Sequence, residues 1–153
     1  IADATAKAAS ENPEIYFIGV DQFIVDGPSN YVGIQFREDQ AGFLVGVLAA
    51  LVIESTGGDT AAGVYGVEIP PVVKFRNGYE QGIRYINPEI TILGSYIDSF
   101  VAPDRGAALA EQFIADGADV IFGAGGPTGS GGIRYAAEQG VRWRNARRRV
   151  PYL

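Results

Sequence analysis

The feature that most constrains the fold of this sequence is a repeated alternation of short apolar runs with segments of helical spacing. Short apolar runs bounded by turn residues are typical of buried strands. We expect such strands over residues 15–20, 31–36, 61–67, 91–97 and 119–122. We expect helices over residues 2–11, 41–55, 72–86, 102–115 and 131–139, the second opening at Glu38 or Asp39. Strands and helices that alternate in this way form βαβ units, so the sequence predicts an α/β fold with a parallel sheet and helices on both faces.

This architecture indicates where a ligand would bind, because open α/β sheets bind ligands outside the carboxyl ends of their strands. The residues at these predicted ends are Asp21, Gly66–Pro71, Asp98–Phe100 and Gly123–Gly132. A carboxylate there can accept hydrogen bonds from a ligand's hydroxyl or amine groups, or it can cap the next turn. Both interpretations stay open for Asp21 and Asp98.

The segment DVIFGAGGPTGSGG, residues 119–132, ends a predicted strand on a loop with six glycines. Glycine allows a turn with positive φ, or the close approach of a ligand or another backbone. The spacing fits neither a dinucleotide-binding fingerprint nor a phosphate-binding loop. What remains is a cradle of backbone N–H groups near a helix N-terminus, which can bind an anion or sugar hydroxyls.

The composition argues against several kinds of chemistry. The sequence contains no histidine and no cysteine, and we therefore expect no catalytic residues, no metal site and no cofactor. There is also no G-x-S-x-G motif, although glycosidase chemistry with two carboxylates stays open. Phe100 lies between a predicted strand and a predicted helix, where its ring could stack on a planar ligand or pack on the helix. Phe75 lies within a predicted helix and is expected in the core.

Charge is distributed unevenly along the chain, whose net charge is −6. The first 141 residues contain all 18 acidic residues and seven of the twelve basic ones, whereas the last twelve residues, RWRNARRRVPYL, contain five arginines. The acidic body argues against nucleic-acid binding. We expect the tail to result from a changed reading frame or a premature ending, or else to be a basic terminus of a functioning protein.

Two further expectations concern the ends and the most apolar segment of the chain. The sequence begins at Ile1 inside an expected helix and has no initiator methionine, so we expect a fragment or a processed product. Its longest apolar window, Ala41–Ile53, is shorter than the roughly 18 residues that cross a bilayer. We expect this window to form a buried helix.

Four segments in order resemble motifs of one protein family. They are ENPEIYFIGVD (residues 11–21), FREDQAGFLVGVLAAL (36–51), PPVVKFRNGYEQGIRYINPEI (70–90) and YIDSFVAPDRGAALAEQFIADGADVIFGAGGPTGSGG (96–132). Together they resemble the basic membrane protein family of ABC-transporter substrate-binding lipoproteins, of the purine-nucleoside-binding type. The family's corresponding patterns include F-x-x-x-E-G-x-x-L-A-G and Y-x-x-S-F-x-D-x-x-K-G, and the last segment also resembles G-A-D-V-I-x-x-A-G-x-T-G-x-G.

The resemblance implies a fold of the periplasmic-binding-protein type I, with two α/β lobes that close on a ligand. Residues 1–35 would form the end of the first lobe and a hinge crossing, residues 36–141 an incomplete second lobe, and residues 142–153 an atypical basic tail. The implied ligand-binding residues are Asp21 at the cleft edge, Phe100 stacked on the base, and Gly125, Gly126 and Thr128 lining the cleft.

The resemblance also implies a function and partners. We expect the solute-binding component of an ABC importer, which binds a purine nucleoside without catalysis and delivers it to a permease. We expect the parent protein to be extracytoplasmic and lipid-anchored, with its signal and lipobox outside this chain. Two alternatives are an α/β enzyme acting on a sugar or nucleotide and a ligand-sensing domain of a transcription regulator. Because the family's I-G-V-D strand does not follow Val141, we expect this chain alone to bind solute poorly and to be marginally stable.

Overall fold

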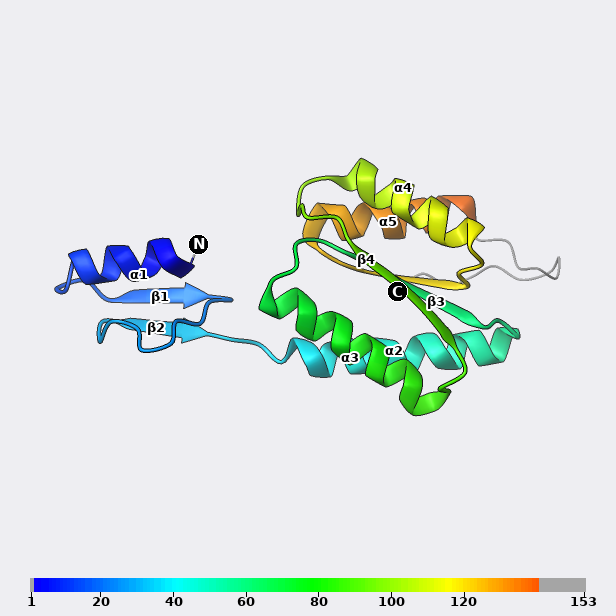
Figure 1. The fold of residues 1–153 in the computed structure, drawn as a ribbon, viewed down its shortest axis with the longest axis horizontal. Coiled ribbons are helices and arrows are strands. Elements are labelled where there is room, and N and C mark those ends of the chain that lie inside the picture. The colour runs from blue at the N-terminus through cyan, green and yellow to red at the C-terminus, as the bar shows by residue number, and fades with distance from the viewer. Residues whose placement is uncertain (1, 141–153) are drawn as a thin grey trace. The chain divides into compact units, whose positions relative to one another are not determined.

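A computed structural model of the chain describes residues 2–140 and divides the chain into two compact units (Figure 1). Unit 1 spans Ile1–Arg37 and unit 2 spans Glu38–Leu153. Each unit is considered by itself below. The basic tail predicted at residues 142–153 lies outside the described residues.

Unit 1 contains one helix and one pair of parallel strands. The elements are α1 (Ala2–Glu11), β1 (Phe17–Val20) and β2 (Tyr31–Ile34), and Phe17 pairs with Tyr31 at the start of the strand pair. Buried Asn30 connects these elements, because its Nδ2 donates to the carbonyl oxygens of Ala9, Asn12 and Ile15 at 3.0, 3.0 and 2.7 Å. One side chain thus joins the end of α1 and the turn after it to the start of β2.

The strands of unit 1 expose one apolar face. Ile18 and Val20 on β1 are 66% and 57% exposed, and Val32 and Ile34 on β2 are 56% and 43% exposed. Parallel strands are normally covered on both faces, and the prediction of a fully buried strand over residues 15–20 is wrong for this face. A continuous apolar run predicts a strand but does not determine how many of its faces are covered.

Unit 2 is a three-stranded parallel sheet between two pairs of helices. Its elements are α2 (Glu38–Thr56), β3 (Thr60–Tyr65), α3 (Pro70–Ile86), β4 (Thr91–Tyr96), α4 (Pro103–Ala115), β5 (Val120–Ala124) and α5 (Gly126–Gln139). The strand order is β4-β3-β5, and both neighbours of β3 run parallel to it, with Gly63 opposite Gly94 and Phe122. Figure 1 shows α2 and α3 on one face of the sheet and α4 and α5 on the other. The predicted α/β fold with a parallel sheet covered on both faces is therefore confirmed for unit 2.

A hydrophobic core lies on each face of this sheet. The core under α2 and α3 includes Ile53, Tyr65, Tyr79, Ile83 and Phe122. The core under α4 and α5 includes Val64, Ile97, Ala110, Phe113 and Ile121. The central strand β3 is buried along its whole length. Phe75 packs against the first core, as expected from its place in the predicted helix.

Helices α2 and α3 contact one another through their backbones. A Cβ atom at Gly46 would lie 2.1 Å from the carbonyl oxygen of Tyr79, and one at Gly82 would lie 2.1 Å from that of Phe43. Such distances leave no room for a side chain. These glycines therefore allow the backbones of the two helices to pack closely.

Elsewhere on α2, three leucines are exposed, so the prediction of a buried helix over residues 41–53 holds only in part. Leu44, Leu48 and Leu51 are 69%, 46% and 48% exposed. Among the described residues, α2 is also the one helix long and apolar enough to cross a bilayer, a test that core helices of soluble proteins pass as well. The sequence-based expectation that no segment reaches this length is thereby corrected.

Helix α5 begins five residues earlier than predicted, at Gly126 rather than Gly131. Pro127 lies in its first turn, where the missing N–H costs nothing and the fixed φ suits a helix. The glycines in this helix allow close packing on α4, since a Cβ atom at Gly131 would lie 2.1 Å from the carbonyl oxygen of Pro103. Most of the predicted glycine loop is therefore the start of a helix.

Candidate functional site at the carboxyl edge of unit 2

The carboxyl ends of β4, β3 and β5 form one continuous edge in unit 2. Asp98 N donates to the carbonyl oxygen of Gly66 at 3.0 Å, and Gly66 N donates to that of Ala124 at 3.0 Å. The residues that follow the three strands are consequently joined by backbone hydrogen bonds. We refer to Gly66, Asp98–Phe100 and Gly125–Gly126 together as the carboxyl edge.

The Phe100 ring lies against Gly66 at this edge. A Cβ atom at Gly66 would lie 2.7 Å from Phe100 Cδ1 and 2.9 Å from Gly125 Cα. Phe100 nevertheless remains 36% exposed. The glycine at position 66 thus provides the space in which the ring lies, while part of the ring stays accessible to a ligand.

Gly66 is a functional candidate that sequence reasoning included only as part of a strand end. Any side chain at this position would collide with the Phe100 ring or with the backbone of Gly125. The available signal was a glycine at the end of a predicted strand, which often marks a close approach of another group. The sequence did not indicate that this group would be an aromatic ring 34 positions away.

Thr128 lies beneath the edge and is completely buried. Its Oγ1 donates to the carbonyl oxygen of Ser99 at 2.7 Å and accepts from Ala102 N at 3.0 Å. Its own N–H donates to the carbonyl oxygen of Phe100 at 3.2 Å. The hydroxyl is therefore engaged within the protein, in the loop that the resemblance implies lines the cleft.

A proline removes one backbone N–H donor from the start of each helix at this edge. Prolines occupy the first or second position of α3, α4 and α5, and the N-cap residues Ile69, Ala102 and Gly125 make no side-chain capping bonds. In α5, Thr128 N bonds to Phe100 and Gly129 N bonds to Gly125 at 3.4 Å. The amides of Thr128 and Gly129, which belong to the predicted N–H cradle, thus bond within the protein. Gly126, in contrast, has the positive φ of 57° that the glycine-rich sequence predicted near this point.

Two aspartates follow strands with positive φ. Asp98 in unit 2 has φ 59° and Asp21 in unit 1 has φ 56°. Both side chains are exposed. Non-glycine residues adopt this conformation uncommonly, although aspartate tolerates it better than most. Asp21 belongs to unit 1, whereas Phe100, Gly125, Gly126 and Thr128 all lie in unit 2.

An arginine and two tyrosines connect α3 to the carboxyl halves of β3 and β4. The Arg76 guanidinium lies 5.6 Å from the Tyr65 ring centroid and 5.2 Å from that of Tyr96. Arg76 Nε also bonds to Glu80 Oε1 at 2.8 Å. Burial raises the pKa of Tyr65 above its usual value, with a further contribution from the Glu80 carboxylate. This packing stabilises the end of β3 immediately before Gly66.

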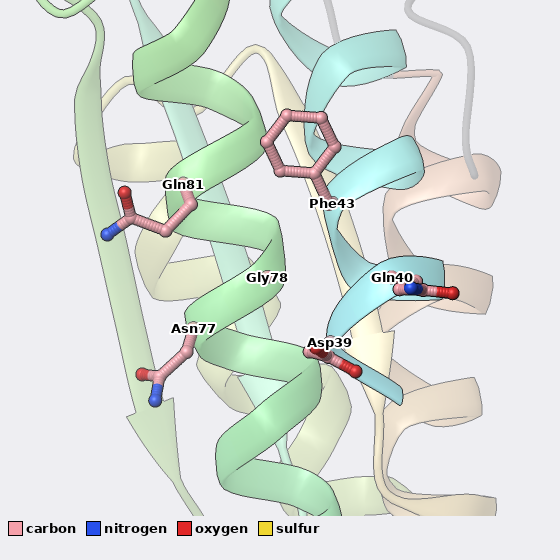
Figure 2. A pocket seen from close by; sticks show the side chains of 6 residues that line it. All are labelled: Asp39, Gln40, Phe43, Asn77, Gly78 and Gln81. Atoms are coloured by element: carbon pink, nitrogen blue, oxygen red, sulfur yellow. The ribbon is translucent and has the colours of Figure 1, made fainter. Parts of the chain in front are cut away.

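Two of the hollows among the described residues are lined by none of the predicted site residues. One of them, of about 320 Å³, lies between α2 and α3. Figure 2 shows its lining side chains, with the Phe43 ring directed toward α3. Its lining residues are Asp39, Gln40, Phe43, Asn77, Gly78 and Gln81. The other, of about 330 Å³, lies in unit 1 beside Tyr31 and Gly33. Among residues 2–140, no cluster of carboxylates could hold a metal ion.

The architecture of the chain is that of ABC-transporter solute-binding proteins. A solute-binding protein from Aeropyrum pernix K1 superposes with a TM-score of 0.83 at 28% identity, over 90% of this chain and 40% of that one. Residues 1–144 match the family described as Bmp, ABC transporter substrate-binding protein PnrA-like. The chain belongs to this family, which confirms the resemblance found in the sequence.

Curated relatives agree with this assignment. Basic membrane protein A1 of Borrelia garinii subsp. bavariensis is 38% identical over 141 residues, which make up 91% of this chain and 41% of the relative. The CD4+ T-cell-stimulating antigen of Listeria monocytogenes is 33% identical over 131 residues, 86% of this chain and 36% of the relative. The chain therefore spans about two fifths of the length of the curated relatives that it matches.

Proposed function

We propose that this chain is part of the solute-binding component of an ABC importer, which binds a purine nucleoside between two lobes without catalysis. Membership of the substrate-binding family supports the general role. The observation that carries the ligand class is the partly exposed Phe100 ring at the carboxyl edge. A flat aromatic face at this position suits a planar base.

The groups around Phe100 suit such a ligand physically. Stacking of a base on an aromatic ring contributes roughly 1–3 kcal/mol. Gly125 and Gly126 at the same edge carry no side chains, so a planar molecule can approach the backbone there. The exposed Asp98 carboxylate follows β4, two residues before Phe100, where it can accept hydrogen bonds from hydroxyl or amine groups. Asp21 would offer the same kind of acceptor from the first lobe.

The proposal extends to the whole protein. Closure of two lobes around the solute would change the surface presented to a membrane permease. The protein would act outside the cytoplasm, anchored to the membrane by lipid. Neither nucleic acid nor a cofactor takes part in this function.

Calorimetry on the full-length gene product tests the ligand class. Guanosine, inosine or adenosine should bind more tightly than ribose, and Phe100→Ala should weaken nucleoside binding by about 1–3 kcal/mol because base stacking is lost. Tyr85→Ala is a matched control, since Tyr85 is a 74% exposed aromatic residue on α3. Equal heats for ribose and guanosine would refute the proposal. Recovery of the nucleoside chemically unchanged after incubation distinguishes binding from an enzymatic reaction.

A further inference from the structure

We propose that Thr128 is a positioning residue that fixes the Phe100 loop for ligand binding. This inference rests on the proposed function, because it assigns a role to the interior of the same site. It differs from the ligand contact that the sequence predicted for Thr128. The threonine acts from below the edge, through the backbone of the loop that carries the aromatic ring.

Three hydrogen bonds carry the inference. Within four consecutive residues of the loop, Thr128 bonds to the carbonyl oxygens of Ser99 and Phe100 and to the amide of Ala102. The backbone is thus bonded on both sides of Phe100 as well as at Phe100 itself. Thr128 itself is completely buried and its two side-chain bonds are part-buried, so removing the hydroxyl leaves their partners unpaired at a cost in free energy.

Thr128 is itself fixed by the packing of two helices. A Cβ atom at Gly106 on α4 would lie 2.0 Å from the Thr128 carbonyl oxygen. Thr128 also lies in the first turn of α5, and its backbone cannot move far without displacing α4. The loop between β4 and α4 therefore takes its position from the contact between α4 and α5.

Two substitutions separate the hydroxyl from the rest of the side chain. Thr128→Val keeps the shape but removes the donor and acceptor, which leaves Ser99 O and Ala102 N without their partner. Thr128→Ser keeps the hydroxyl and loses only a methyl group. If the hydroxyl positions the loop, the valine variant should lose function and the serine variant should retain it.

The test measures amide exchange and nucleoside binding on the full-length gene product. In Thr128→Val, the Ala102 amide should exchange about tenfold faster, as expected for the loss of one hydrogen bond of typical strength. Inosine affinity should fall about tenfold, a part of the stacking contribution. Both quantities should stay near the original values in Thr128→Ser. In a Phe100→Ala background, Thr128→Val should cause no further loss of affinity, since Thr128 acts through the ring.

Several outcomes would overturn the proposal. One is unchanged inosine affinity in Thr128→Val despite faster exchange at the Ala102 amide. Another is a loss of inosine affinity from Thr128→Val that is as large in the Phe100→Ala background as in the original protein. If Thr128→Val does not fold, Thr128→Ala takes its place, with Thr128→Ser as the rescue. If the original protein binds no nucleoside, the proposed function fails separately. NMR line shapes of the Phe100 ring then decide the positioning role, since an equally ordered ring in the valine variant would contradict it.

Discussion

The two units use similar strand sequences but cover them differently. In unit 2, β3 is flanked by strands on both sides and covered by helices on both faces, so that all six of its residues are buried. In unit 1, β1 has one partner strand, and Ile18 and Val20 are exposed. Apolar residues in a strand therefore stabilise a unit only to the extent that other elements cover them.

Because of this difference in coverage, we expect the two units to differ in stability. Unit 2 contains a core on each face of its sheet. In unit 1, the hydrogen bonds of Asn30 hold the end of α1 and the following turn to the start of β2. Four aliphatic side chains of its strands lie on an exposed face. We expect unit 2 to unfold as the more stable cooperative region and unit 1 to depend on whatever covers its open face.

The largest expected effect on the free energy of unfolding appears when an isoleucine is replaced by alanine in unit 2 and the same replacement is made in unit 1 for comparison. Ile83→Ala removes a side chain that is 0% exposed in unit 2, whereas Ile18→Ala removes one that is 66% exposed in unit 1. The first should lower the free energy of unfolding by roughly 2–5 kcal/mol, and the second by less than about 0.5 kcal/mol. Urea unfolding of the 153-residue chain measures both. Similar losses in the two variants would show that the face of unit 1 is covered in solution.

A second effect is a loss of stability at alkaline pH that arises in unit 2. Burial raises the pKa of Tyr79 well above its usual value, and burial also raises the pKa of Tyr65. The folded state thus keeps both phenols protonated while the unfolded state loses these protons above about pH 10. At one pH unit above this point, each phenol should lower the free energy of unfolding by about 1.4 kcal/mol.

Tyr79→Phe provides the control for this pH dependence. The variant should lose the part of the alkaline destabilisation that Tyr79 causes, at the cost of its 3.3 Å hydrogen bond to the carbonyl oxygen of Ala62. Unfolding midpoints measured from neutral to alkaline pH give the comparison. If the unfolding midpoint of the variant falls with pH as steeply as that of the original protein, Tyr79 does not contribute to the alkaline destabilisation.

The smallest expected effect concerns the start of α4 at the carboxyl edge. Ala102 is its N-cap and provides no side-chain cap, so Ala102→Ser should raise the free energy of unfolding by about 0.5–1 kcal/mol. Ala108→Ser places a serine at an exposed position in the middle of the same helix. This substitution should lower the free energy of unfolding slightly. Thermal unfolding of both variants checks the opposite signs, and equal signs would contradict this account of the helix start.

The sequence predicted the order and type of the described elements because each apolar run and each helical period is a local pattern. Helix α1 begins and ends where the sequence indicates, at Ala2 and Glu11. The start of α5 was predicted five residues late because Gly126 and Pro127 resemble a loop when they are considered locally. Their helical conformation depends on the close packing of α5 against α4, which no local pattern reveals.

The position of the carboxyl edge was predictable from the sequence, but the contacts within it were not. The alternation of strands and helices correctly indicated that Phe100, Gly125 and Gly126 would lie at one sheet edge. It could not show that Gly66 provides space for the Phe100 ring, or that the Thr128 hydroxyl bonds to residues 26 and 29 positions away. These roles depend on tertiary contacts between loops that the sequence places far apart.

The central claim is that the carboxyl edge of unit 2 binds the ligand. A titration of the ¹⁵N-labelled full-length gene product with inosine, followed by amide chemical shifts, tests this most directly. The claim predicts that the largest shift changes occur at Gly66, Phe100, Gly125 and Gly126, and that ribose causes smaller ones. Changes centred on the hollow between Asp39 and Gln81, with the carboxyl edge unaffected, would contradict it.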